Sequence, residues 1–141
     1  MASLVPKYVK KEIVEGYAGE SLWLMLLTNA HAPNAETQRY VSDIVANEIV
    51  DSGGIYPAGG IELTGKTSQY DSANAYLDAN DLQVGPGAYL TYRYGILYTK
   101  TGGASQATYR IRAHIDFLAD QVAINGTSLI QWNALGIIYV S

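Results

Sequence analysis

The chain has 141 residues, no cysteine and a formal net charge of −4. A single domain of this length can bury a core without covalent cross-links. The lack of cysteine excludes disulfide frameworks, thiolate nucleophiles and cysteine-ligated zinc. Nine basic residues against thirteen acidic ones argue against a nucleic-acid binder, because phosphate contacts need a basic surface. The twelve tyrosines are typical both of β-strands and of surfaces that contact other proteins.

No segment is expected to cross a membrane. The longest uninterrupted apolar run, residues 22–27, has six residues, whereas a spanning helix needs about 20. The lysines near the N-terminus are followed by Glu12 and Glu15 and not by an apolar segment, so no signal peptide is predicted. We therefore expect neither a membrane partner nor an export signal.

The N-terminal segment mixes helical and extended patterns. Residues 1–6 are expected to form an extended arm. Val9, Ile13 and Tyr17 recur every four residues, which indicates a short helix over 7–17. The same segment is also rich in good strand formers, so a strand remains the alternative.

The next forty residues suggest a strand, a loop and a helix. Residues 21–28 form a continuous apolar segment, typical of a strand buried on both faces. Pro33 and two polar clusters predict a loop over 29–39. The apolar residues of segment 40–50 lie at helical spacing and predict a second short helix.

The rest of the chain is predicted to be short strands between glycine-rich turns. Brief strands are expected between residues 61 and 84, followed by a tight turn at 85–87. The alternating segments 89–99 and 108–118 indicate an antiparallel hairpin with one apolar face on each strand. Asn125-Gly126 predicts a further hairpin turn.

These elements predict a mainly β fold. It is an antiparallel β-sandwich or a jelly-roll-like barrel, with one or two short helices in the N-terminal third. The expected domain organisation is an N-terminal arm with a short helix or strand over 1–20, and a single β-sandwich domain over 21–141.

The sequence offers no catalytic pattern. Its two histidines, His31 and His114, have no Gly-x-Ser-x-Gly motif to serve. We interpret His31 as a surface loop residue. His114 shares the polar strand face with Arg110, Arg112 and Asp116, which we interpret as solvated or salt-bridged, an anion site being the alternative. We predict that the protein is not an enzyme and uses no cofactor.

A metal site and a sugar-binding site are the remaining candidates. The Asp- and Asn-rich stretch over 71–81 lacks the spacing of a calcium loop and suits backbone turns better. Trp23 lies in an apolar run, and Trp132 alternates with Ile130 on one strand face. Both tryptophans are therefore expected to pack in the core, with exposed rings that stack sugars as the alternative. No metal is predicted.

Several segments, in their order along the chain, resemble small virion structural proteins of tailed bacteriophages. No single motif is diagnostic, and the likeness covers about residue 21 to the C-terminus. The resemblance implies a β-rich virion component with no enzymatic role and no cofactor. The similar segments are 23–29, 42–49, 52–60, 92–98 with 101–103, and 125–138.

The resemblance leads to a specific functional expectation. We expect a capsid decoration (cement) protein, assembled in the host cytoplasm, that binds the major capsid protein on the outer head and forms a homo-oligomer. The alternatives are a neck or tail adaptor or fibre-associated protein, and a carbohydrate-binding β-sandwich. The predicted interface lies in the N-terminal arm, at Leu4, Val5, Pro6, Tyr8 and Val9.

Overall fold

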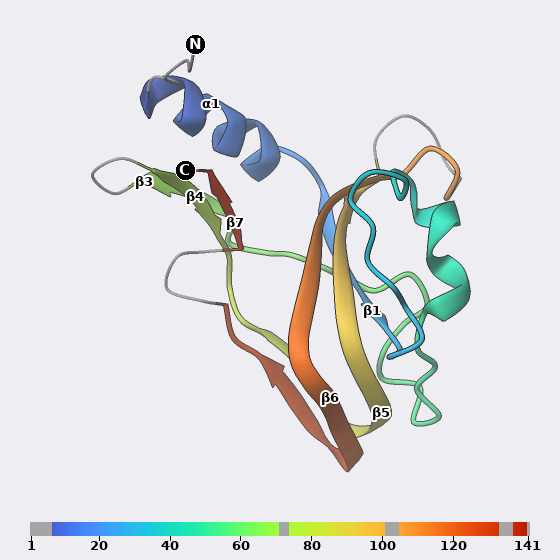
Figure 1. The fold of residues 1–141 in the computed structure, drawn as a ribbon. Coiled ribbons are helices and arrows are strands. Elements are labelled where there is room, and N and C mark those ends of the chain that lie inside the picture. The colour runs from blue at the N-terminus through green and yellow to red at the C-terminus, as the bar shows by residue number, and fades with distance from the viewer. Residues whose placement is uncertain (1–6, 71–73, 101–104, 133–136, 141) are drawn as a thin grey trace.

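The fold is mainly antiparallel β, with one α-helix near the N-terminus (Figure 1). The computed structural model describes residues 7–70, 74–100, 105–132 and 137–140. Its two sheets are not closed, so of the two predicted architectures the sandwich describes the protein and the barrel does not. The helical elements are α1 (Lys7–Ala18) and the 3₁₀ turns η1 (Val41–Asp43) and η2 (Val45–Asn47). The strands are β1 (Leu22–Leu27), β2 (Ile61–Glu62), β3 (Thr67–Tyr70), β4 (Ala75–Asp78), β5 (Leu82–Thr99), β6 (Arg110–Ile130) and β7 (Ile138–Val140).

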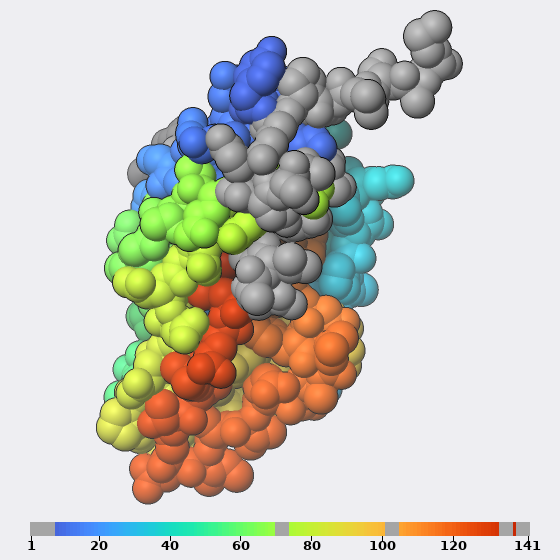
Figure 2. Space-filling model, turned by 90° about the vertical axis from the view of Figure 1, so that its left-hand side faces the viewer, coloured from blue at the N-terminus to red at the C-terminus, as the bar shows by residue number. Residues whose placement is uncertain are grey.

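The strands form a main sheet and a small sheet. The main sheet has the order β2-β1-β5-β6 and the small sheet the order β3-β4-β7, and the neighbouring strands in both are antiparallel. Helix α1 lies against β3 and β4. Figure 2 shows this side of the molecule, with α1 at the top, the small sheet below it and part of β6 at the bottom.

Helix α1 confirms the helical interpretation of the N-terminal segment, but with a different buried face. Val14 is fully buried, and Tyr17 and Ala18 pack beside it against the larger core. Ile13, predicted on the apolar stripe, is 42% exposed. The helix ends before Gly19, whose N–H donates to the carbonyl of Glu15 at 3.1 Å. Through Val14, α1 shares one core with the strands that follow it.

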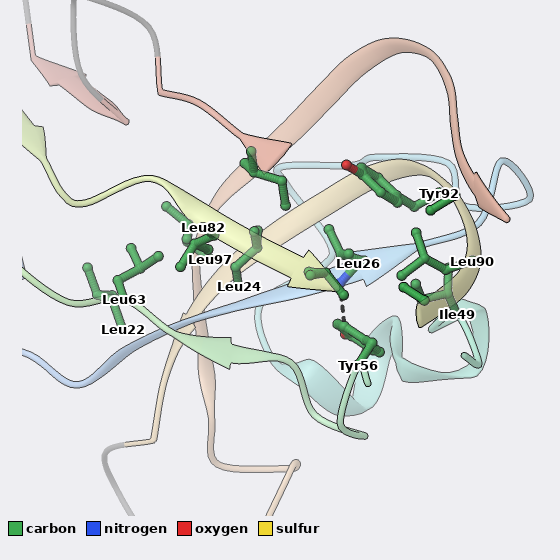
Figure 3. Packing of buried hydrophobic residues seen from close by; sticks show 14 of the residues in the cluster. Leu22, Leu24, Leu26, Ile49, Tyr56, Leu63, Leu82, Leu90, Tyr92 and Leu97 are labelled. Carbon is green, nitrogen blue, oxygen red and sulfur yellow. Dashed lines mark hydrogen bonds between the residues drawn. The ribbon is translucent and has the colours of Figure 1, made fainter. Parts of the chain in front are cut away.

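Strand β1 lies inside the main sheet between β2 and β5, as its apolar sequence predicted. Leu24 and Leu26 point into the larger core, whereas Met25 and Leu27 point into a smaller core on the opposite face. Figure 3 shows the larger core, where side chains of β1 and β5 meet Tyr56 and Leu63 from the loops. The main sheet is therefore covered on both faces along β1.

The predicted helix over residues 40–50 is wrong. The segment contains the two short turns η1 and η2, and its two ends are bound to different strands. At one end the N–H of Val41 donates to the carbonyl of Tyr109 at 3.0 Å, and at the other the N–H of Ile49 donates to the carbonyl of Leu26 at 3.1 Å. These bonds fix the two ends of the segment to separate strands, and only the short 3₁₀ turns form between them in place of the helix that the local spacing indicates.

The predicted turns at residues 85–87 and at Asn125-Gly126 are also wrong. Strands β5 and β6 continue through both positions and form one long ribbon, whose pairs include Val84 with Ser128. The two glycine-containing segments lie opposite each other, and the register shifts between them. A Cβ atom on Gly85 would lie 2.4 Å from the carbonyl oxygen of Gly126. The glycines therefore permit a close approach of two strands inside a bulge.

A second bulge divides the predicted apolar face of β5. Tyr92 pairs with Gln121 but Tyr94 pairs with Asp116, so four residues of β6 lie opposite Arg93. A shift of register moves the following side chains to the other face of the sheet. As a result Tyr92 packs in the larger core, whereas Ile96 and Tyr98 pack in the smaller one. The prediction that alternate residues from 90 to 98 share one face is therefore wrong beyond Tyr92.

Candidate interaction surface

Exposed apolar side chains are concentrated between residues 118 and 129 of strand β6, which we name the outer half of this strand. Leu118 is 81% exposed, Val122 61%, Ile124 77% and Leu129 55%. Strand β6 is the terminal strand of the main sheet. Among the described residues, the edge of β6 that faces away from β5 has one backbone pairing, the isolated bridge of Arg110 with Tyr40. Apolar side chains on an edge strand favour contact with another protein.

Part of this surface surrounds a hollow of about 540 Å³ between β5, β6 and the loop after η2, which we name the apolar hollow. Val50 is 86% exposed at its rim, and Tyr89 is 43% exposed. Among the described residues that line it, Glu48 is the only charged one. The hollow therefore suits apolar side chains of a partner better than a charged ligand. It is lined by Thr28, Glu48, Ile49, Val50, Tyr89, Leu90, Thr91, Val122, Ala123 and Ile124.

The loop that carries Val50 is fixed to β5 by the carboxylate of Asp51. This carboxylate accepts hydrogen bonds from four backbone amides, including that of Tyr89 at 2.8 Å and that of Tyr56 at 2.9 Å. These bonds favour the ionised form, the bond from Tyr89 most of all, and hold the pKa of Asp51 below its usual range. One wall of the apolar hollow is thereby preorganised.

Tyr56 and Glu48 fix the opposite side of the same loop. The Tyr56 hydroxyl accepts a hydrogen bond from the N–H of Leu26 at 3.0 Å and donates to Oε2 of Glu48 at 2.9 Å. That oxygen also accepts the N–H of Gly59 at 2.8 Å. Burial raises the pKa of Tyr56, so the hydroxyl stays protonated. Glu48 is therefore already engaged on the protein side of the hollow.

The two histidines form a pair that the sequence did not predict. His31 is 3% exposed, and its ring stacks on that of His114 at a centroid distance of 5.8 Å and meets Tyr94 edge-on at 5.5 Å. Neither ring nitrogen of His31 has a hydrogen-bond partner among the described residues. Burial lowers the pKa of both histidines, and the charge of His114 lowers that of His31 further. His31 is thus a neutral packing residue, and its interpretation as a surface residue is wrong.

The charged residues near His114 form ion pairs with different partners. Arg112 binds Glu20, which follows α1, through two hydrogen bonds of 3.0 and 2.6 Å. Asp116 pairs with Arg93 of β5 at 2.9 Å, and this contact lowers the pKa of Asp116. Part of the predicted polar face is thus salt-bridged, whereas the ring of His114 faces His31.

The predicted interface in the N-terminal arm lies mostly outside the described residues. Leu4, Val5 and Pro6 are in the part of the chain that is not described. Tyr8 is 66% exposed in the first turn of α1, and Val9 is half-buried. The surface on β6 was not predicted from the sequence, because only the pairing with β5 shows that residues 118–129 continue one long strand with an uncovered face.

The remaining candidates are the metal site and the two tryptophans. No group of three or more metal-ligating side chains occurs among the described residues, and no described helix is long and apolar enough to span a membrane. The tryptophans are half-buried. The ammonium of Lys100 lies 3.7 Å from the ring centroid of Trp23, and Nε1 of Trp132 donates to the carbonyl of Asn80 at 3.0 Å.

Comparisons of the chain with protein-family models, curated protein sequences and solved structures find no match. The molecule is a small antiparallel β protein whose exposed apolar side chains are concentrated on one edge strand.

Proposed function

We propose that the protein is a structural component of a tailed-phage virion. In this proposal it is a capsid decoration (cement) protein that forms a homo-oligomer and binds the major capsid protein on the outer head. The observation that carries the proposal is the group of exposed apolar side chains on the outer half of β6 and around the apolar hollow. The resemblance to virion proteins supplies the class of partner.

The physical properties of this surface suit a protein partner. Burial of apolar area contributes about 25 cal/mol per Å², and Val50, Val122 and Ile124 are all more than half exposed in the single chain. The bonds of Asp51 and Tyr56 hold the loop in place, which reduces the entropy lost on binding. A decoration protein would use this surface many times on one shell, and each attached copy adds interface area that opposes disruption of the head.

The test uses heads of the phage that encodes the chain, prepared without this protein. Purified protein should bind saturably and raise the temperature at which the heads disrupt. The double variant V122D/I124D should bind at least tenfold more weakly, because it places two charges in the apolar surface. Wild-type protein that neither binds heads nor is found on them would refute the proposal, and immunolabelling of the neck or tail alone would assign it there instead.

Two further variants separate the possible surfaces. I55D changes an exposed apolar residue outside the lining of the apolar hollow and should bind as the wild type does. Y8D tests the interface predicted at the start of α1. If Y8D abolishes binding and V122D/I124D does not, the helix and not the β6 surface contacts the capsid. The mass of the free protein, from light scattering, tests the expected homo-oligomer.

A further inference from the structure

Three of the four arginines of the chain line one hollow of about 320 Å³. Arg110 and Arg112 belong to the start of β6, and Arg39 to the loop before η1. We name this feature the arginine hollow. The described residues that line it include no acidic one and are Ala35, Gln38, Arg39, Tyr40, Arg110, Ile111 and Arg112.

Backbone pairing brings these arginines together from distant parts of the sequence. Tyr40 and Arg110 form an isolated antiparallel bridge, and the carbonyl of Arg39 accepts the N–H of Ile111 at 2.8 Å. The carboxylate of Asp43 accepts the backbone N–H groups of Arg39 and Tyr40, both at 3.0 Å. The loop is therefore attached to the edge of β6, with two exposed arginines beside each other.

The three guanidinium groups differ in what compensates their charge. Arg112 is held by Glu20 through two hydrogen bonds and lies 5.3 Å from the ring centroid of Tyr17. The side chains of Arg39 and Arg110 make no hydrogen bond or ion pair with the residues that the structure describes. The nearby Asp43 carboxylate is occupied by backbone amides. Among the described residues, the guanidinium groups of Arg39 and Arg110 are thus unpaired and lie beside the Arg112–Glu20 ion pair.

Positive charges elsewhere on the described surface have partners. Arg93 is paired with Asp116, the ammonium of Lys66 donates to the carbonyl of Glu20, and Lys100 lies over Trp23. The whole chain carries a net charge of −4. The arginine hollow is therefore a local basic site on an acidic protein, without the extended basic surface that nucleic acids require.

We propose that the arginine hollow binds a carboxylate from an acidic segment of a partner protein. The planar guanidinium fork matches a carboxylate through two parallel N–H···O bonds. Arg39 and Arg110 supply the two unpaired guanidinium groups, and Arg112, held in place by Glu20 outside the lining, forms part of the wall. This inference is independent of the proposed virion function, because it uses residues outside the apolar hollow.

The test titrates the full-length protein with a blocked tetraglutamate peptide, followed by NMR of the backbone amides and arginine Nε–H groups. We expect saturable binding with shifts at Arg39 and Arg110, and at least a tenfold weaker affinity for R39Q/R110Q. The variant R39K/R110K keeps the positive charge but lacks the planar guanidinium group, and its affinity for the peptide should lie between those of the wild type and R39Q/R110Q. Parallel titrations with inorganic phosphate and with a single-stranded DNA 20-mer distinguish a carboxylate from other oxyanions.

The control R93Q/K11Q removes the same total charge outside the arginine hollow and should bind the peptide within twofold of the wild type. Circular dichroism and thermal unfolding show whether each variant is folded. The proposal is overturned if the peptide does not bind saturably, if R39Q/R110Q binds as the wild type does, or if phosphate or DNA binds more tightly than the peptide. Head binding is measured separately, so failure of one proposal does not imply failure of the other.

Discussion

The β5–β6 ribbon has an inner half and an outer half with different surroundings. In the inner half, residues 94–99 of β5 pair on one side with β1 and on the other with β6, and both faces of the sheet are covered. In the outer half, residues 82–92 of β5 pair with β6 and with no other strand that the structure describes. One face there is buried in the larger core, while β6 exposes Val122, Ile124 and Leu129.

This difference shows how one pair of strands can serve two purposes. The inner half is stabilised by packing on both faces, so its apolar residues are explained by folding alone. The exposed apolar residues of the outer half add little to the stability of the single chain. In the proposed function, a second molecule covers them.

The largest expected effect contrasts a leucine from the inner region with one from the outer half. Leu97, in the inner half of β5, is fully buried, and L97A should lower the free energy of unfolding by about 2–5 kcal/mol. Leu129 is 55% exposed, and L129A should change it by about 0.5 kcal/mol or less. Urea unfolding of both variants measures the difference. Equal losses would contradict the distinction between the halves.

The second prediction concerns the tyrosine that links β1 to the loop. Y56F removes the acceptor of the buried N–H of Leu26 and a donor to Glu48. We expect a loss of about 1–3 kcal/mol in the free energy of unfolding. Tyr89 of the outer half makes no side-chain hydrogen bond with the described residues, so Y89F is the matched control and should be nearly neutral. A Y56F protein as stable as Y89F would show that the buried bond is dispensable.

The third prediction is a pH dependence of stability from the inner half. Burial lowers the pKa values of His31 and His114 below the ordinary value of 6.5, so the unfolded chain binds protons more readily than the folded one. Stability should therefore fall as the pH drops below about 6.5. Asp51 and Asp116 have pKa values lowered from 3.8, so the stability they contribute is lost only at more acidic pH. Thermal unfolding between pH 7.5 and 5 measures the effect.

The matched variant for this prediction is H31Q/H114Q. It removes both titrating groups and should show a flatter dependence of melting temperature on pH over the same interval. The rings of His31 and His114 stack on each other, and Tyr94 contacts the ring of His31. The ion pair of Asp116 with Arg93 lies on strands β6 and β5. An unchanged slope in the variant would assign the pH dependence to other groups.

The smallest expected effect on stability is at the apolar hollow. V122T/I124T should change the free energy of unfolding by about 0.5 kcal/mol or less, since both side chains are mostly exposed. The same variant should nevertheless weaken binding to heads, because it reduces the apolar area available for the contact. A large loss of stability would show that these residues serve folding of the single chain and not recognition.

Features set by local sequence were predicted well. The apolar run of β1, the short helix α1 and the alternating segments that became the inner half of the ribbon all follow from periodicity and length. Features set by pairing between distant segments were predicted poorly. The turns at 85–87 and Asn125-Gly126 are wrong because partner strands impose an extended path there, and the helix over 40–50 is wrong because its two ends are bound to separate strands.

The candidate sites also combine features set by local sequence with features set by contacts between distant segments. Arg110, Arg112 and His114 were recognised as a polar group with an anion site as one interpretation, but Arg39 joins the first two only through the bridge at Tyr40. His31 lies 83 positions before His114, and nothing in its local sequence indicates that the rings stack. Contacts between residues so far apart depend on topology, which local patterns do not contain.

By itself, the sequence determined the fold class, the buried central strand and the absence of cysteine chemistry, since these depend on composition and short-range periodicity. Only the tertiary structure decided which apolar residues remain exposed. The bulge opposite Arg93 moves the later side chains of β5 to the other face of the sheet, and the shifts around Gly126 do the same on β6, where Ala123 and Ile130 both face the larger core. The apolar hollow and the arginine hollow both result from strand pairing over long sequence distances.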